Sequence, residues 1–90
     1  MDVYEKAAEK IIREQENIIG PLALEQARKV AGLEVDDHHV RFKGNKIETL
    51  ERLVEQYRQL FGQTSVEVCK EATHPLFSEL PPQQIPSLLR

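Results

Sequence analysis

Apolar residues recur at intervals of three and four over the first part of the chain, which predicts an amphipathic helix. Asp2 and Glu5 have the D-x-x-E spacing of a capping box and would start it, since each side chain can accept a hydrogen bond from a free backbone amide. The polar run 14–16 interrupts the stripe, so we expect the core contact of this helix to weaken in the middle. The apolar positions are Tyr4, Ala7, Ala8, Ile11, Ile12, Ile18 and Ile19.

Gly20 and Pro21 would end this first helix and begin a second one. Glycine adopts the left-handed conformation that often follows a helix C-terminus, and proline is tolerated in the first turn of the next helix. The inner side of the second helix, within residues 21–31, would consist of Leu24, Ala27 and Ala31. The pattern therefore predicts a helix hairpin over residues 2–31.

Two short alternations of apolar and polar residues follow, at 33–35 and 40–42, on either side of the polar run 36–39. Such alternation is typical of a β-hairpin, but the turn lacks the Asn-Gly or Asp-Gly pair that favours one strongly. Two possibilities stay open for residues 32–44: a β-ribbon that lies against the helices, or an irregular loop.

The most regular helical stripe in the chain begins at Asn45, which has capping-box spacing to Glu48. Gly62 would end this helix as Gly20 ends the first. The stripe consists of Ile47, Leu50, Leu53, Val54, Tyr57, Leu60 and Phe61.

A fourth helix is predicted after Gly62, with Thr64 and Glu67 in the positions of a third capping box. Because a proline disfavours helical geometry in the residue before it, Pro75 should end this helix near His74. Its inner face would consist of Val66, Cys69, Ala72 and Thr73.

The two predicted helix pairs resemble each other when Gly20 is aligned with Gly62, without a gap. Polar as well as apolar positions match, which favours an internal repeat over two unrelated amphipathic hairpins. One pair cannot cover its own apolar stripe, whereas two pairs packed face to face can. We expect a pseudo-twofold axis with four side chains at its centre: Ile11, Ile18, Leu53 and Leu60.

The last part of the chain, residues 75–90, is rich in proline yet too apolar for a solvated tail. Proline segments with spaced leucines bind grooves at low entropic cost, because proline limits the conformations of the free chain. Two interpretations remain: the segment seals its own bundle, or it docks onto a partner or a second copy. The residues predicted to bind the partner are Leu76, Phe77, Leu80, Ile85, Leu88 and Leu89.

Together these patterns predict an all-α fold: a four-helix assembly of two similar helix hairpins, with a short central loop or β-ribbon and a proline-rich C-terminal arm. Residues 1–77 would form a single helical domain, and residues 78–90 the C-terminal arm. Within the domain, the first repeat would span 2–31, the loop or ribbon 32–44 and the second repeat 45–74. A chain of this length forms one domain with a small core.

The charge balance argues against general binding to nucleic acid or to an anionic membrane. Twelve basic and 15 acidic residues give a formal net charge of −3, and both partners require that phosphates be neutralised. No apolar run approaches the length of a membrane-spanning helix, and the start of the chain lacks the pattern of an export signal. One cysteine, Cys69, cannot form an internal disulfide, which fits a reducing compartment. We therefore expect a cytoplasmic protein.

Few residues are placed for chemistry. Cys69 falls on a predicted inner face, where no neighbouring base or charge would activate it as a nucleophile. His38 and His39 would point to opposite sides of a strand, and they lack the spacing of metal ligands. We predict no catalytic residue, metal or cofactor. One candidate contact with an anion lies near the start of the third helix, at Arg41, Lys43 and Lys46.

The leading hypothesis is a non-enzymatic protein–protein interaction or regulatory module. It would bind a protein partner or form a homodimer through an apolar helical face and the C-terminal arm. The runner-up is a small helix-turn-helix DNA-binding regulator that uses residues 53–72, which loosely resemble that motif. Two features weaken it: Arg58 stands where a small residue lets the helices touch, and Glu67 and Glu71 would face phosphates.

Overall fold

Four α-helices and one β-hairpin form the chain in the computed structural model, which describes residues 2–90. The prediction of a mostly helical fold is confirmed, and the segment after the second helix is the β-ribbon rather than an irregular loop. The elements are α1 (Val3–Ile19), α2 (Leu22–Ala27), β1 (Leu33–Asp36), β2 (His39–Phe42), α3 (Lys46–Phe61) and α4 (Gln63–Phe77), followed by two 3-10 helices, η1 (Pro82–Gln84) and η2 (Ser87–Leu89).

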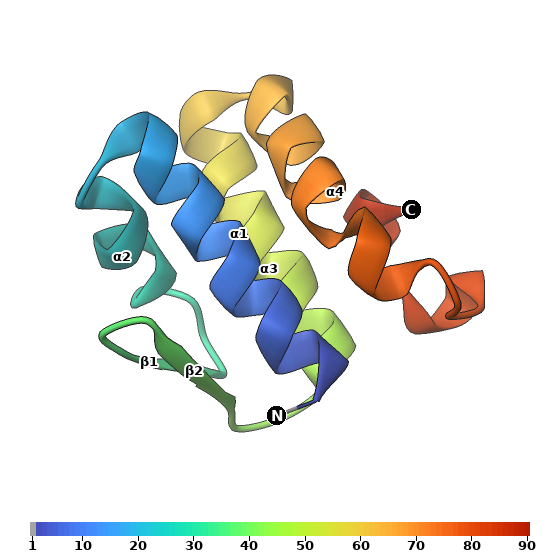
Figure 1. Ribbon diagram of the computed structural model, residues 1–90. Helices are drawn as coiled ribbons and strands as arrows, with labels where there is room; N and C mark the ends of the chain where they lie inside the picture. The colour runs from blue at the N-terminus through green and yellow to red at the C-terminus, as the bar shows by residue number, and fades with distance from the viewer. Residues whose placement is uncertain (1) are drawn as a thin grey trace.

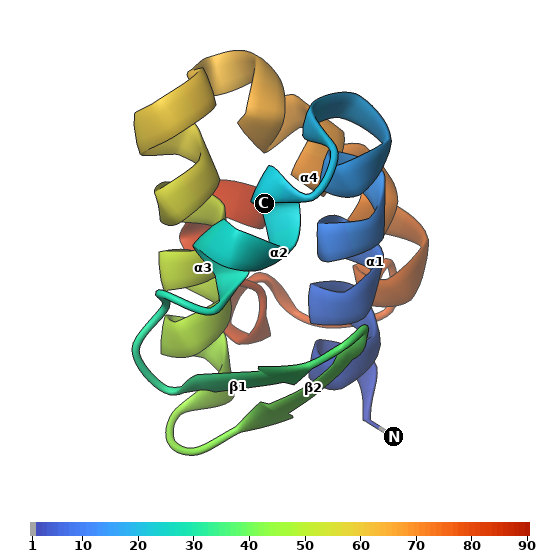
Figure 2. The same cartoon turned by 90° about the vertical axis from the view of Figure 1, so that its left-hand side faces the viewer.

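The four helices surround one hydrophobic core. Figure 1 shows α1 and α3 side by side and running in the same direction, while α4 packs against both in the opposite direction. The short α2 contacts α1 and α3 from the other side, so that α2 and α4 lie on opposite sides of this pair (Figure 2). The β-hairpin crosses the end of the bundle at which α1 and α3 begin.

The ends of α1 and α3 follow the predicted capping chemistry. Asp2 and Glu5 form a complete capping box, with the Glu5 amide 2.8 Å from Asp2 Oδ1 and the Asp2 amide 3.3 Å from Glu5 Oε1. Asn45 accepts a hydrogen bond from the backbone amide at the third position of α3, which is one half of the predicted capping box. Gly20 and Gly62 end the two helices with φ of 68° and 81°, a backbone conformation that residues with a Cβ rarely adopt.

Two predictions about α4 are wrong. Thr64 does not cap the helix, because Gly62 ends α3 and starts α4 at once, so Thr64 already lies inside the first turn. Pro75 does not end the helix near His74, and α4 continues to Phe77. Pro75 lies in the last turn, where its missing amide removes one hydrogen bond, and burial of Phe77 against the core compensates for that loss.

The polar run in α1 does not weaken its core contact, contrary to the prediction. Gln15 is buried, and its amide nitrogen donates to the Ser65 carbonyl oxygen at 3.1 Å and to Cys69 Sγ at 3.4 Å. A buried polar group with its hydrogen bonds satisfied is tolerated in a core. Gln15 therefore joins α1 to the start of α4, and the α1–α4 contact is the most extensive between two helices.

The central packing expected of a pseudo-twofold axis is only half present. Ile11 and Leu53 are fully buried, but Ile18 is 61% exposed and Leu60 51% exposed. Both exposed residues lie in the turn before a capping glycine, Ile18 at the end of α1 and Leu60 at the end of α3. The second helices also differ in length, since α2 ends at Ala27 whereas α4 has 15 residues. The internal repeat stays a prediction.

The β-hairpin is held against α1 by two carboxylates. Its strands pair antiparallel, and the turn uses Asp37 in a left-handed conformation with φ of 56°. The Val40 amide donates to a Glu9 carboxylate oxygen at 3.2 Å, and His38 Nε2 lies 2.7 Å from a Glu16 carboxylate oxygen. Tertiary contacts therefore supply the support that an isolated two-stranded ribbon lacks in water.

Candidate functional site

The C-terminal arm, residues 78–90, returns to the bundle after α4 and lies across α3. The chain turns through Pro81, Pro82 and η1, and η2 then contacts both α3 and α4. Figure 1 shows this path, with the C-terminus behind α4. Of the two interpretations of the arm, the structure shows it packed on its own bundle.

Apolar side chains anchor the arm in the core. Leu89 is 7% exposed, Pro86 is almost completely buried, and Phe77 at the end of α4 is 4% exposed. The Phe77 ring lies 5.9 Å from the ring of Tyr4, centre to centre. The remaining residues predicted to bind a partner are partly buried against the core: Leu76, Leu80, Ile85 and Leu88. The six residues are therefore brought to one side of the bundle, where they face its own core.

Hydrogen bonds from two helices fix the backbone of the arm. One carboxylate oxygen of Glu51 on α3 accepts from the Leu88 amide at 2.9 Å, and the other accepts from the Ser87 hydroxyl. The Tyr4 hydroxyl on α1 donates to the Gln84 carbonyl oxygen at 2.7 Å. The hydrogen bonds that hold a docked peptide through its backbone have this form, with the side chains seated in the receptor.

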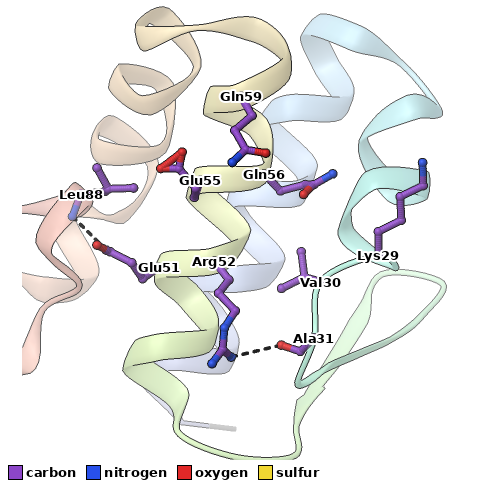
Figure 3. Close-up of a pocket in the computed structure, with 9 residues that line it drawn as sticks. All are labelled: Lys29, Val30, Ala31, Glu51, Arg52, Glu55, Gln56, Gln59 and Leu88. Atoms are coloured by element: carbon purple, nitrogen blue, oxygen red, sulfur yellow. Dashed lines mark hydrogen bonds between the residues drawn. The ribbon is translucent and has the colours of Figure 1, made fainter.

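Two clefts flank the arm along α3. The first, of about 390 Å³, lies between the end of α2 and the arm, and Figure 3 shows Leu88 and Glu51 at one side with Lys29 and Ala31 at the other. The second, of about 420 Å³, lies on the other side of Ser87. Both clefts are lined by Glu51 and Arg52, so they are neighbours along α3 with the arm between them. We call the two clefts and the surface under the arm the α3 groove.

Charges of both signs line the α3 groove. The Arg52 guanidinium donates to the Ala31 carbonyl oxygen at 3.4 Å and lies 3.8 Å from a Glu48 carboxylate oxygen. A hydrogen bond from Arg58 lowers the pKa of the Glu55 carboxyl, which is therefore ionised near neutral pH. Because carboxylates lie among the cations that line it, the groove is suited to a peptide with its own polar backbone rather than to a free anion.

Two of the three basic residues predicted to contact an anion are paired locally with carboxylates. Lys43 lies 3.6 Å from Glu34, and Lys46 pairs with Asp2, whose hydrogen bond raises the pKa of the Lys46 amine. Arg41 is exposed on β2. An anion at this site would have to compete with the two carboxylates, and the contact stays a prediction.

The side chains that could act as a nucleophile or a metal ligand, a cysteine and two histidines, lie apart from the α3 groove. Cys69 is buried, as the pattern predicts, and burial raises the pKa of its thiol to about 11, which keeps it protonated and unreactive. His38 lies between Glu16 and Asp37, with its ring nitrogens 2.7 Å and 3.1 Å from their carboxylate oxygens, and His39 is exposed. Among residues 2–90, no three His, Cys, Asp or Glu side chains are placed to share a metal ion.

The residues of the groove itself were not identified from the sequence. Glu51 and Arg52 lie on the polar face of an ordinary amphipathic helix, and nothing in their spacing marks them as contacts for a segment more than 30 residues away. In the sequence Tyr4 belongs to an apolar stripe, although in the structure its hydroxyl donates a hydrogen bond to the arm. Only the apolar arm residues carried a detectable pattern.

Within the described part of the chain, no helix has the length and apolar character needed to cross a membrane. Comparison of the chain with known protein families, with curated proteins and with solved structures finds no match. Function is therefore inferred from the geometry of the groove and the arm.

Proposed function

We propose that this chain is a non-enzymatic protein–protein interaction module that self-associates, with the α3 groove and the C-terminal arm as its contact surface. One observation carries the proposal: the arm is bound like a peptide ligand, with buried apolar anchors and a backbone held by Glu51, and clefts remain on both sides of it. A surface that binds this segment is a surface suited to short apolar peptides with a polar backbone.

The rest of the molecular surface offers little for a stable interface. Among residues 2–90, three large hydrophobic side chains are strongly exposed: Ile18, Leu22 and Leu60, at 61%, 39% and 51%. Three partly exposed aliphatic side chains fall far short of the roughly 800 Å² per partner that a standard interface buries. We therefore propose the groove and the arm, rather than another apolar helical face, as the contact surface.

No observation favours the DNA-binding alternative. Glu67 and Glu71 are exposed on α4, the helix that would enter the major groove. Lys70 lies 3.7 Å from Glu67 and is partly neutralised by it. Carboxylates in this position would repel phosphates. A cytoplasmic location belongs to the same proposal as the interaction module, because the single cysteine is a free thiol.

Sedimentation velocity over a dilution series tests the proposal. A self-associating chain shifts from a monomer of 10.4 kDa towards a dimer as its concentration rises. A monomer at every concentration from micromolar to millimolar would refute self-association. A duplex-DNA titration at low salt serves as the comparison, and we expect no binding there.

A further inference from the structure

We propose that two copies of this chain exchange their C-terminal arms, so that the arm of each copy fills the α3 groove of the other. The inference rests on the proposed self-association and names its mode, its contact residues and its partner, which is a second copy. In the described chain the arm occupies the groove of its own bundle, and this intramolecular complex shows what the groove accepts.

The interactions that hold residues 86–90 would be remade in the exchanged form, whereas the hydrogen bond from Tyr4 to Gln84 lies in the segment that changes its path. Leu89 would occupy the same buried position, and the Leu88 amide and the Ser87 hydroxyl would donate to Glu51 of the other chain. Because the two chains have identical sequences, each interaction of residues 86–90 that is broken within one chain is replaced by the same interaction between the two chains. Exchange is therefore opposed by the cost of association, by any strain in the connecting segment and by the loss of that segment's own contacts, such as the hydrogen bond from Tyr4 to Gln84.

The segment between α4 and the anchors is suited to a change of path. Residues 79 and 81–84 are exposed, and the backbone amides of Leu80 and Gln84 donate only to carbonyls three residues earlier. Two consecutive prolines, Pro81 and Pro82, favour an extended path in a free chain. Fully extended, residues 78–85 would span about 26 Å, close to the 27 Å middle dimension of the molecule. The anchors can therefore reach the groove of an adjacent copy.

The clefts beside the arm give an incoming arm a place to bind before the resident one leaves. Figure 3 shows Glu51 bonded to the Leu88 amide at one wall of the first cleft, with Lys29, Val30 and Ala31 at the opposite wall and the cleft between them. Arg52 lines both clefts, so an incoming arm would meet groove residues on either side. Exchange would then proceed without complete exposure of the apolar groove to water.

Two full-length variants with complementary defects test the exchange. Leu89→Asp places a charge where the arm inserts into the core, so this chain has a defective arm and an intact groove. Glu51→Lys cannot accept the two hydrogen bonds from the arm, so this chain has a defective groove and an intact arm. Each variant alone should lose the dimer, because the same defect meets the arm within a chain and between chains and releases it from every groove.

An equimolar mixture of the two variants should recover a dimer that contains both chains, because one intact arm meets one intact groove. Light scattering with a mass tag on one variant identifies the mixed species. Glu71→Lys is the matched control: it makes the same change of charge on the exposed face of α4, at a residue that lines neither cleft of the groove, and should leave the dimer unchanged. Should Leu89→Asp lose its cooperative thermal transition, Leu89→Ala replaces it as the variant with the weakened arm.

The outcomes separate the two proposals. A wild-type chain that is monomeric throughout would refute self-association and the exchange together. A wild-type dimer that both variants form equally well would refute the exchange and leave self-association through another surface. A mixture that stays monomeric while the wild type dimerises would also overturn the exchange. A Leu60→Ser variant that abolishes the dimer would assign it to the exposed end of the bundle.

Discussion

Removal of the Leu89 side chain tests whether the C-terminal arm is part of the core. Leu89 is 7% exposed and belongs to the same apolar cluster as residues of all four helices. A buried Leu→Ala change costs about 2–5 kcal/mol of unfolding free energy, and the lower end applies where neighbouring groups can relax into the space left. Because open clefts flank the arm, we expect Leu89→Ala to cost about 2 kcal/mol.

The cost has an upper bound that the structure also sets. The arm can leave the groove without unfolding of the bundle, so the loss cannot exceed the free energy of docking the arm. Within a total stability of about 5–10 kcal/mol, a loss of about 2 kcal/mol lowers the midpoint of thermal unfolding by roughly 10 °C for a domain of this size.

Urea denaturation at neutral pH measures the loss directly, and hydrogen exchange at the Leu88 amide, which bonds to Glu51, reports arm release. The control is Leu60→Ala, which shortens a leucine that is 51% exposed and should cost less than about 0.5 kcal/mol. Equal losses in the two variants, or unchanged exchange at Leu88, would contradict the docking of the arm on its own bundle.

Three further predictions concern the bundle itself. The unfolded Cys69 thiol ionises near its ordinary pKa of 9, whereas burial holds the pKa of the folded thiol at about 11. The free energy of unfolding should therefore fall by about 1 kcal/mol as the pH rises by about one unit above 9. Urea melts of Cys69→Ala should lack this part of the loss, and identical pH profiles for the variant and the wild type would refute the assignment. Tyr57→Phe removes a buried hydrogen bond of 2.7 Å to the Ala23 carbonyl oxygen and should lower the free energy of unfolding, measured by chemical denaturation, by about 1 kcal/mol. An unchanged free energy would show that the position of α2 does not depend on this hydrogen bond. Gly62→Ala, at φ of 81° with open space around the new Cβ, should lower the free energy of unfolding by about 1–2 kcal/mol. Gly32→Ala should lower it more, because the new Cβ would lie 2.9 Å from Thr49 Oγ1. Thermal melts that reverse this order would contradict the steric explanation.

Local chemistry explains the features of the fold that were predictable. The capping box at Asp2 and the glycines that end α1 and α3 act through backbone groups a few residues away, so their effect is visible in the sequence. The helical stripe of α3 likewise follows from its own periodicity. Such features depend on neighbours in the chain and require no knowledge of the tertiary fold.

Features set by tertiary packing were predicted less well. Gln15 reads as part of a solvated run, yet Ser65 and Cys69 satisfy its amide inside the core. Leu60 continues an apolar stripe, yet it is 51% exposed in the last turn of α3. Pro75 breaks the helical pattern, but a single lost hydrogen bond in the last turn is outweighed by burial farther on. In each case a contact distant in sequence decides the outcome.

The candidate site likewise has one part that was predictable from the sequence and one part that was not. The arm was recognisable, because prolines and spaced leucines are a compositional pattern. The α3 groove was not, because the roles of Glu51 and Tyr4 depend on where the arm returns to the bundle. Sequence alone therefore showed the segment that binds but not the surface that receives it.

The most direct test of self-association through arm and groove is an isotope-filtered NOE measurement on an equimolar mixture of labelled and unlabelled full-length chains. Our account predicts cross-peaks between the Leu88 amide of one chain and the Glu51 side-chain protons of the other, at a concentration where sedimentation shows the dimer. Cross-peaks confined to a single chain in such a dimer would contradict it.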